Sequence, residues 1–298
     1  VVEVTDNDAM YAQRTPRTEV MAKVKEDFDY AMANVRSNDG EDYVNKAVVA
    51  TIASRCMLFE GTWYIYHKND EAMKTCSDVD SKAKLFLEAA KGYAEQIINS
   101  GTLYSRPSSR EIILYRAYNK SINNGSQHCI ASYSNGNEAQ TQSGNLSTLK
   151  AWICQDGKPY SNSTVENAKS FRLQDMVVTR DPRFEATFWD EPKASATGLY
   201  CEKFIDREGP TYSYNGKSLP TYYGSCTNEN GFPCVRYAET VLNWIEAKAE
   251  LADKFGGAAV TQEDLDKSIN AIRKRPLDKT AIDKGVKQTA PLELANMP

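Results

Sequence analysis

The sequence predicts a mainly α-helical protein whose middle region is rich in loops. Near both ends of the chain, apolar residues recur at steps of three and four, which is the spacing of an amphipathic helix. The middle region is instead rich in Gly, Asn, Ser, Pro and Tyr, and its apolar runs are short. We therefore expect one domain over residues 1–298, with helical hairpins in 1–104, a loop-rich region with small strands in 105–234 and a helix pair in 235–276.

The first long helix is predicted to begin at Thr15-Pro16, with Thr15 as N-cap and Pro16 as the first helical residue. A single apolar stripe then follows at steps of three and four: Val20, Val24, Phe28, Ala31 and Val35. The polar stretch 37–40 should end this helix.

The next helix, in residues 43–66, is apolar on most sides and should be buried between other helices. One face carries Val44, Val48, Ile52, Phe59 and Trp63. A second face carries Ala47, Ala50, Ala53 and Met57, whose small side chains let a neighbouring helix approach closely. We interpret Trp63, Tyr64, Tyr66 and Trp244 as packing residues of helices rather than as ligand-binding residues.

Two further helical segments complete the pattern. Residues 81–98 carry the stripe Phe86, Ala90, Tyr93 and Ile97. Near the C-terminus the stripe is Val235, Ala238, Leu242, Ile245, Ala249 and Ala252, and residues 254–257 end that helix. Leu242 and Ile245 should be buried, so Leu242→Ala should cost about 2–5 kcal/mol. Thr261 and Asp264 form a capping-box pattern for a last helix, whose stripe is Leu265, Ile269 and Ile272.

Helix pairs of this kind, with small residues at their contacts, are the unit of tetratricopeptide-like arrays. No exact repeat period is present, because roughly 130 residues of different composition intervene between the helical ends. In that middle part, two short apolar runs could form strands, at 111–118 and 184–189.

The composition excludes several classes of function. The chain carries a net charge of -4, whereas a dedicated nucleic-acid binder needs a basic face. It holds no run of about 18 apolar residues, so no helix is expected to span a membrane. The two histidines, His67 and His128, are far apart in sequence, which argues against a histidine-based triad or zinc site. Among seven cysteines, Cys226 and Cys234 could form a disulfide, and free thiols are the alternative.

Two charged clusters have structural interpretations. In Arg-Asp-Pro-Arg at 180–183, Asp-Pro should start a turn, and the arginines should tie it to helix ends or carboxylates. Glu239, Glu246 and Glu250 lie near one another on a predicted helix, where ion pairing with Arg236 or Lys248 is the simplest role.

The predicted ligand site lies in the loop-rich region. There, tyrosines and amides occur in segments too polar to pack as a core, and an aromatic ring can stack on a sugar while amides bind its hydroxyls. We expect ligand binding by Tyr118, Asn119, Asn124, His128, Tyr133, Tyr212 and Tyr214. Such a site needs no cofactor, no metal and no catalytic residue, so affinity should change little between about pH 6 and 8, except through His128. Ordinary surface loops are the alternative interpretation.

Several separated motifs occur in an order typical of one protein family. The C-terminal helices hold Arg-Tyr-Ala-Glu at 236–239, Asn-x-x-Glu-Ala-x-x-Glu at 243–250, and Asn270 with Arg273 and Arg275. Further matches are the helix and turn at 83–104, Glu-Ile-Ile at 111–113, Asp-Gly-Lys-Pro at 156–159 and Arg-Asp-Pro-Arg at 180–183. Together they resemble the SusD/RagB family, the surface nutrient-binding lipoproteins of Bacteroidetes, over nearly the whole chain.

The resemblance implies a non-enzymatic protein at the extracellular face of the outer membrane. It would capture an oligosaccharide or another nutrient and deliver it to a SusC-type TonB-dependent transporter. Members of the family are usually longer and begin with a signal peptide and a lipidated Cys. We therefore expect this chain to be a fragment trimmed at both ends, with the membrane anchor outside it.

Two other functions remain open at this point. The helical hairpins alone would also suit a tetratricopeptide-like adaptor that binds only protein, and glycan binding would separate it from the first hypothesis. A glycoside hydrolase would need two carboxylates roughly 5 to 10 Å apart across a cleft, and no motif in the sequence pairs two acids in this way.

Overall fold

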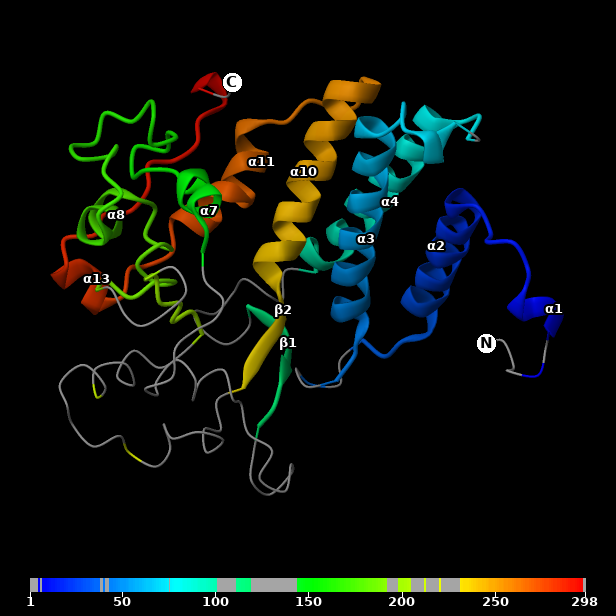
Figure 1. The fold of residues 1–298 in the computed structure, drawn as a ribbon, viewed down its shortest axis with the longest axis horizontal. Helices are drawn as coiled ribbons and strands as arrows, with labels where there is room; N and C mark the ends of the chain where they lie inside the picture. The colour runs from blue at the N-terminus through cyan, green and yellow to red at the C-terminus, as the bar shows by residue number, and fades with distance from the viewer. Residues whose placement is uncertain are drawn as a thin grey trace. The chain divides into compact units, whose positions relative to one another are not determined.

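The computed structural model describes residues 5, 7–37, 40, 43–74, 76–100, 111–118, 144–191, 198–204, 212, 220 and 231–296. The chain divides into two compact units. The first comprises Val1–Glu111 with Glu239–Ala259, and the second comprises Ile112–Ala238 with Val260–Pro298. In the described part, helices predominate over two short strands, which confirms the mainly α-helical class (Figure 1).

The first unit is built from long helices. Its elements are α1 (Asn7–Met10), α2 (Arg17–Asn34), α3 (Lys46–Tyr66), η1 (Glu71–Met73), α4 (Val79–Ile98) and most of α10 (Tyr237–Phe255). The three helices predicted before residue 100 are thereby confirmed, with ends that shift by a few residues. Pro16, for example, precedes α2 instead of opening it, and its carbonyl accepts the first hydrogen bonds of the helix.

The helices α3 and α4 form a hairpin in which small residues set the distance. On α3, Ala50, Ala53 and Met57 are fully buried, as predicted for the small-residue face. At Gly61 a Cβ atom would lie only 2.7 Å from Cγ of Leu87 on α4, so no larger residue fits there without a shift. The predicted close approach of a neighbouring helix is therefore confirmed. The tetratricopeptide-like arrangement stays a prediction.

The prediction for the larger side chains of α3 is wrong at two positions. Val44, just before the helix, is 60% exposed, and Phe59 is 57% exposed. The small-residue face of α3 packs against α4. The side chains of Val44 and Phe59 lie outside this contact, and the described residues leave them largely exposed. Phe59 stacks on Trp63, with ring centroids 5.9 Å apart, and Trp63 in turn stacks on His67.

The helix α10 packs through polar as well as apolar residues. Across the contact with α3, the hydroxyls of Thr51 and Thr240 lie 2.7 Å apart, and Asn243 donates to Ser54 at 2.9 Å. Both pairs are buried, so these polar residues belong to the packed face. The predicted stripe of α10 contains only apolar residues, so it does not include Thr240 and Asn243. The predicted burial of Leu242 is therefore wrong: this side chain is 40% exposed. The predicted burial of Ile245 is confirmed.

These two positions give a direct test of the face that α10 buries. Ile245→Ala should lower the free energy of unfolding by about 2–5 kcal/mol, because it leaves a cavity in the packed core. Leu242→Ala should cost less than about 1 kcal/mol, since this side chain is already partly in water. Urea unfolding of both variants measures the difference. Equal losses would contradict the orientation of α10 described above.

The end of α10 and the start of the next helix follow the predicted signals. Gly256 has a left-handed φ of 65°, and the amide of Gly257 donates to the carbonyl of Leu251, which closes the helix. Thr261 then caps the following helix: its hydroxyl accepts from the amide of Asp264, whose carboxylate accepts from the amide of Thr261. The capping box is therefore confirmed.

The second unit combines two strands with short helices. Its elements are β1 (Ile112–Arg116), α7 (Leu146–Ala151), α8 (Leu173–Thr179), β2 (Phe232–Arg236), α11 (Gln262–Lys267), α12 (Ile269–Arg273), α13 (Lys279–Asp283) and η3 (Leu294–Asn296). The strands pair antiparallel, with Ile112 opposite Arg236 and Arg116 opposite Phe232. The predicted strand at 111–118 is thereby confirmed.

The other predicted strand, at 184–189, is wrong. Residues 182–187 form consecutive turns, in which the amide of Phe184 donates to the carbonyl of Asp181 and that of Phe188 to the carbonyl of Phe184. Asp-Pro starts these turns, as its chemistry favours. The apolar residues of the segment still enter a core, since Phe184 and Phe188 pack with Met176, Val177, Leu199, Ala281 and Val286.

Two further observations concern expectations from composition. Cys234 has a free and exposed thiol, so the alternative of free thiols holds for this residue. None of the helices among the described residues is long and apolar enough to cross a membrane.

Candidate functional site

The structure describes two of the seven residues predicted to bind ligand. Tyr118 follows strand β1 and is half-buried, with the guanidinium carbon of Arg116 lying 5.6 Å from the centre of its ring. Tyr212 is also half-buried. The other predicted residues lie outside the described part of the chain: Asn119, Asn124, His128, Tyr133 and Tyr214. Their assignment to a ligand site stays a prediction.

Two residues of strand β2 and two residues at 203–204 form a group of aromatic and cationic side chains, which we call the Phe204 cluster. It consists of Lys203, Phe204, Phe232 and Arg236. The ammonium nitrogen of Lys203 lies 5.1 Å from the centre of the Phe204 ring, and the guanidinium carbon of Arg236 lies 5.2 Å from it. Phe232 meets the same ring edge-on, with centroids 6.1 Å apart. Phe204 is 36% exposed, so the cluster reaches the surface.

The backbone at Phe204 is strained. Its φ is 68°, in the left-handed region that bulky side chains rarely adopt. A residue held in this region costs of order 1–3 kcal/mol and persists where the surrounding structure holds it in place. Here the ring packs against Phe232 and two cations. Sequence reasoning missed this cluster, because no property of a Phe in sequence indicates a left-handed backbone.

The motifs at 154–163 and 180–187 form one hydrogen-bonded framework, in which Cys154, Arg180 and Asp181 are buried. The segments pair directly, because the amide of Gln155 donates to the carbonyl of Thr179 and that of Asp181 to the carbonyl of Ile153. Asp181 is 2% exposed and accepts hydrogen bonds from Arg183 and from the hydroxyl of Thr289. Burial alone would raise the pKa of Asp181, but these hydrogen bonds outweigh burial and hold the pKa below its ordinary value.

Arg180 is the centre of this framework. It is fully buried, and its guanidinium donates to the carbonyl of Ala168 at 2.7 Å, to the carbonyl of Ser170 at 3.3 Å and to the hydroxyl of Thr179 at 3.1 Å. The rings of Tyr160 and Phe171 lie 5.8 and 5.7 Å from its guanidinium carbon. These contacts agree with the structural interpretation of Arg-Asp-Pro-Arg.

The glutamates of α10 also have structural partners. Glu239 accepts a bidentate pair of hydrogen bonds from Arg55 of α3, and Glu250 accepts from the hydroxyl of Tyr66 at 2.8 Å. The sequence pointed to Arg236 or Lys248 as partners, and the contact with Arg55 could not be inferred from helix spacing alone. Desolvation and the neighbouring Glu250 raise the pKa of Glu246.

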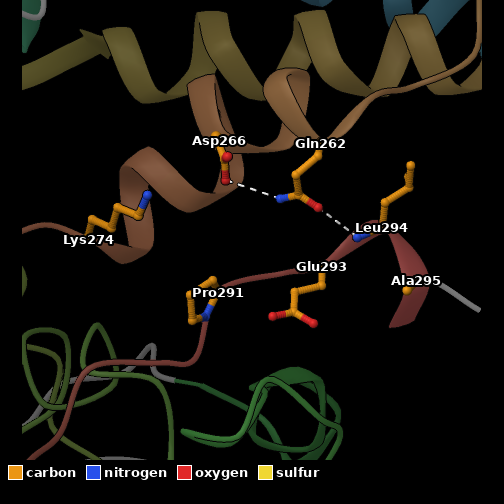
Figure 2. Close-up of a pocket in the computed structure, with 7 residues that line it drawn as sticks. All are labelled: Gln262, Asp266, Lys274, Pro291, Glu293, Leu294 and Ala295. Carbon is orange, nitrogen blue, oxygen red and sulfur yellow. Dashed lines mark hydrogen bonds between the residues drawn. The ribbon is translucent and has the colours of Figure 1, made fainter.

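A pocket in the second unit is lined by Gln262, Asp266, Lys274, Pro291, Glu293, Leu294 and Ala295 (Figure 2). Its amide and carboxylate groups hold the C-terminal segment. Gln262 donates to Asp266 at 3.1 Å and accepts from the amide of Leu294 at 2.9 Å (Figure 2). Next to the pocket, the buried Asn270 binds both the amide and the carbonyl of Leu292. These groups serve the fold, and we do not assign ligand binding to them.

Comparison with known proteins gives one match. The model of the SusD family matches residues 110–288, which is more than half of the chain. No curated protein and no solved structure matched. The matched range includes the Asp-Gly-Lys-Pro and Arg-Asp-Pro-Arg segments, which backbone hydrogen bonds join, and the C-terminal helices. The chain therefore belongs to the SusD family.

Proposed function

We propose that this protein binds an oligosaccharide, or another nutrient, at the cell surface and passes it to a SusC-type TonB-dependent transporter without chemical conversion. The observation that carries the proposal is membership of the SusD family, whose proteins bind nutrients at the surface of Bacteroidetes. The family match runs through residues of both compact units, which supports treating them as parts of one SusD-like domain. On this proposal the protein is lipid-anchored at the extracellular face of the outer membrane.

The binding site that we propose centres on Tyr118 and the residues after it. Tyr118 lies at the end of β1 beside Arg116, so an aromatic ring and a cation are already next to each other where the loop-rich segment begins. An aromatic ring loses little conformational entropy when a ligand stacks on it. Asn119, Asn124, His128 and Tyr133 would add hydrogen bonds and a second ring, together with Tyr212 and Tyr214.

Affinity electrophoresis tests the proposed function. The chain would be run through gels that contain neutral polysaccharides, such as starch, xyloglucan and galactomannan, or acidic ones. Retardation by at least one polysaccharide, without release of reducing sugar during long incubation, is expected. If none retards the chain, it is no glycan receptor, and an adaptor that binds only protein becomes the better hypothesis. Co-purification with the transporter from the outer membrane tests the proposed partner.

The role of Tyr118 can be measured once a retarding polysaccharide is known. Tyr118→Ala should weaken binding by about 1–3 kcal/mol, by analogy with the stacking of bases on aromatic side chains. Isothermal titration calorimetry measures the loss, and thermal unfolding shows whether the variant is still folded. Tyr30→Ala serves as the matched control, because Tyr30 is 72% exposed on α2, away from the proposed site in sequence. Unchanged affinity of Tyr118→Ala would place the site elsewhere.

A further inference from the structure

We propose that Cys76 and Lys82 form an oxidation-sensitive site, at which a hydroperoxide links the sulfur of Cys76 to the nitrogen of Lys82 by a covalent S–N bond. The inference is independent of the proposed function. It starts from a contact at the beginning of α4, where the ammonium nitrogen of Lys82 lies 3.7 Å from the sulfur of Cys76. The thiol is free, and both residues are half-buried.

Backbone hydrogen bonds hold both residues in place. The amide of Cys76 donates to the carbonyl of Met73 at 2.9 Å, and the amide of Lys82 donates to the carbonyl of Asp78 at 2.9 Å. Lys82 stands in the first turn of α4, so its flexible four-carbon side chain reaches back to a cysteine that lies just before the helix. A rotation within that side chain would bring nitrogen and sulfur together without a change of the backbone.

The ammonium of Lys82 has no competing partner in the described part of the chain. The thiol is its only hydrogen-bond partner there, and no described carboxylate pairs with it. Two other lysines of the same helix, Lys84 and Lys91, pair instead with Glu88 and Glu95. The amine of Lys82 is therefore available to react with the sulfur once it has given a proton to solvent.

A second, independent observation is the hydroxyl of Tyr64. The side chain of Tyr64 is fully buried, and its hydroxyl has no hydrogen-bond partner among the described residues, although such buried groups are normally paired. Burial raises the pKa of Tyr64 to about 12, and the charges of Glu60 and Cys76 act in the same direction, so the hydroxyl lies within electrostatic range of the thiol. An oxygen atom added to the sulfur would offer this hydroxyl the acceptor that it lacks.

The reaction has two balanced steps. In the first, a hydroperoxide gives one oxygen to the sulfur of Cys76: the O–O bond breaks, an S–O bond forms, and the thiol proton leaves with the second oxygen as water or alcohol. In the second, the lone pair of the Lys82 amine attacks the sulfur of this sulfenic acid; an S–N bond forms, the S–O bond breaks and the oxygen leaves as water. The sulfur is oxidised by two electrons, and the peroxide is reduced by the same two. The product closes a ring over residues 76–82 and removes the charge of Lys82.

Treatment of the folded chain with hydrogen peroxide, followed by digestion and mass spectrometry, tests the proposal. We expect a linked peptide in which Cys76 and Lys82 together have lost two hydrogen atoms, and dithiothreitol should reverse the loss. Cys234 is the internal control, because its thiol is exposed and has no lysine partner among the described residues. Dimedone, which traps sulfenic acids, should label Cys234 and leave Cys76 mostly unlabelled.

Variants separate the two steps. Lys82→Met keeps the thiol but removes the amine, so the cross-link should be lost and dimedone labelling of Cys76 should rise by about tenfold or more. Lys84→Met is the matched control, because Lys84 is an exposed lysine on the same helix, and it should leave the yield of the cross-link unchanged. Tyr64→Phe removes only the hydroxyl. It should lower the yield severalfold, and thermal unfolding shows whether the variant is still folded.

Three results would overturn the proposal. In the first, dimedone labels Cys76 equally in the unchanged chain and in Lys82→Met, so the amine takes no part. In the second, Cys234 is oxidised while Cys76 stays unchanged. In the third, the linked peptide also contains an added oxygen, which contradicts a direct S–N bond. None of these results bears on glycan binding, because the gels that test it contain no oxidant.

Discussion

Arg180→Ala should lower the free energy of unfolding by about 3–5 kcal/mol, because it combines a cavity with the loss of several buried hydrogen bonds. The Arg180 side chain is fully buried, and its guanidinium is a donor to two backbone carbonyls and to the hydroxyl of Thr179. Without it, the carbonyls of the buried Ala168 and of the half-buried Ser170 lose this donor. An unpartnered buried acceptor costs about 1–3 kcal/mol.

Two further variants separate the contributions to this loss. Arg180→Met fills most of the volume but donates no hydrogen bond, so it should recover the cavity contribution and still cost about 1–3 kcal/mol. Arg172→Ala is the control, because Arg172 is exposed at the start of α8 and should change stability by less than about 0.5 kcal/mol. Urea unfolding measures all three. A folded, stable Arg180→Ala variant that no longer binds glycan would contradict the structural role and make Arg180 a ligand residue.

The helices could be predicted from sequence because their signals are local. Spacing of apolar residues, the capping box of Thr261 and Asp264, and the glycines after Phe255 act within a few residues of each other, and the structure confirms each. The buried face of α10 could not be predicted in the same way. Thr240 and Asn243 are buried because partners on α3 satisfy their polar groups, and those partners are nearly two hundred residues away in sequence.

The candidate site could be predicted only in part, because some of its contacts also join residues that are distant in sequence. The motif Arg-Asp-Pro-Arg indicates a turn held by arginines, and its turn and hydrogen bonds follow from that chemistry. The cations around Phe204 come instead from two segments, at 203–204 and 236, that meet only in the folded chain. The spacing of apolar residues and the composition do not indicate that these two segments are in contact, so the cluster could be found only in the structure.

Lys284→Met should also lower the free energy of unfolding by about 3–5 kcal/mol, because it leaves a buried carboxylate without its cation. Lys284 follows α13, and its ammonium lies 3.0 Å from both Glu185 and Asp190. The side chain of Glu185 is only 1% exposed. Burial would lower the pKa of Lys284, but the two carboxylates outweigh burial and raise it. The contribution is therefore complete at pH 7 and is lost only as the pH rises through that raised pKa.

A double variant shows whether the missing charge is the cause. In Lys284→Met with Glu185→Gln, no buried carboxylate remains at position 185, so at least about half of the loss should be recovered. Lys279→Met is the matched control on α13 itself, because its ion pair with Asp283 is exposed, and such pairs contribute about 0.5 kcal/mol or less. Urea unfolding at pH 7 gives the free energies of the unchanged chain, of Lys284→Met, of Glu185→Gln, of the double variant and of Lys279→Met. The contrary outcome is that the free-energy losses of the two single variants add up to the loss of the double variant. Lys284 would then stabilise the fold by packing against Trp189, whose ring centre lies 5.7 Å from its ammonium nitrogen, rather than by its charge.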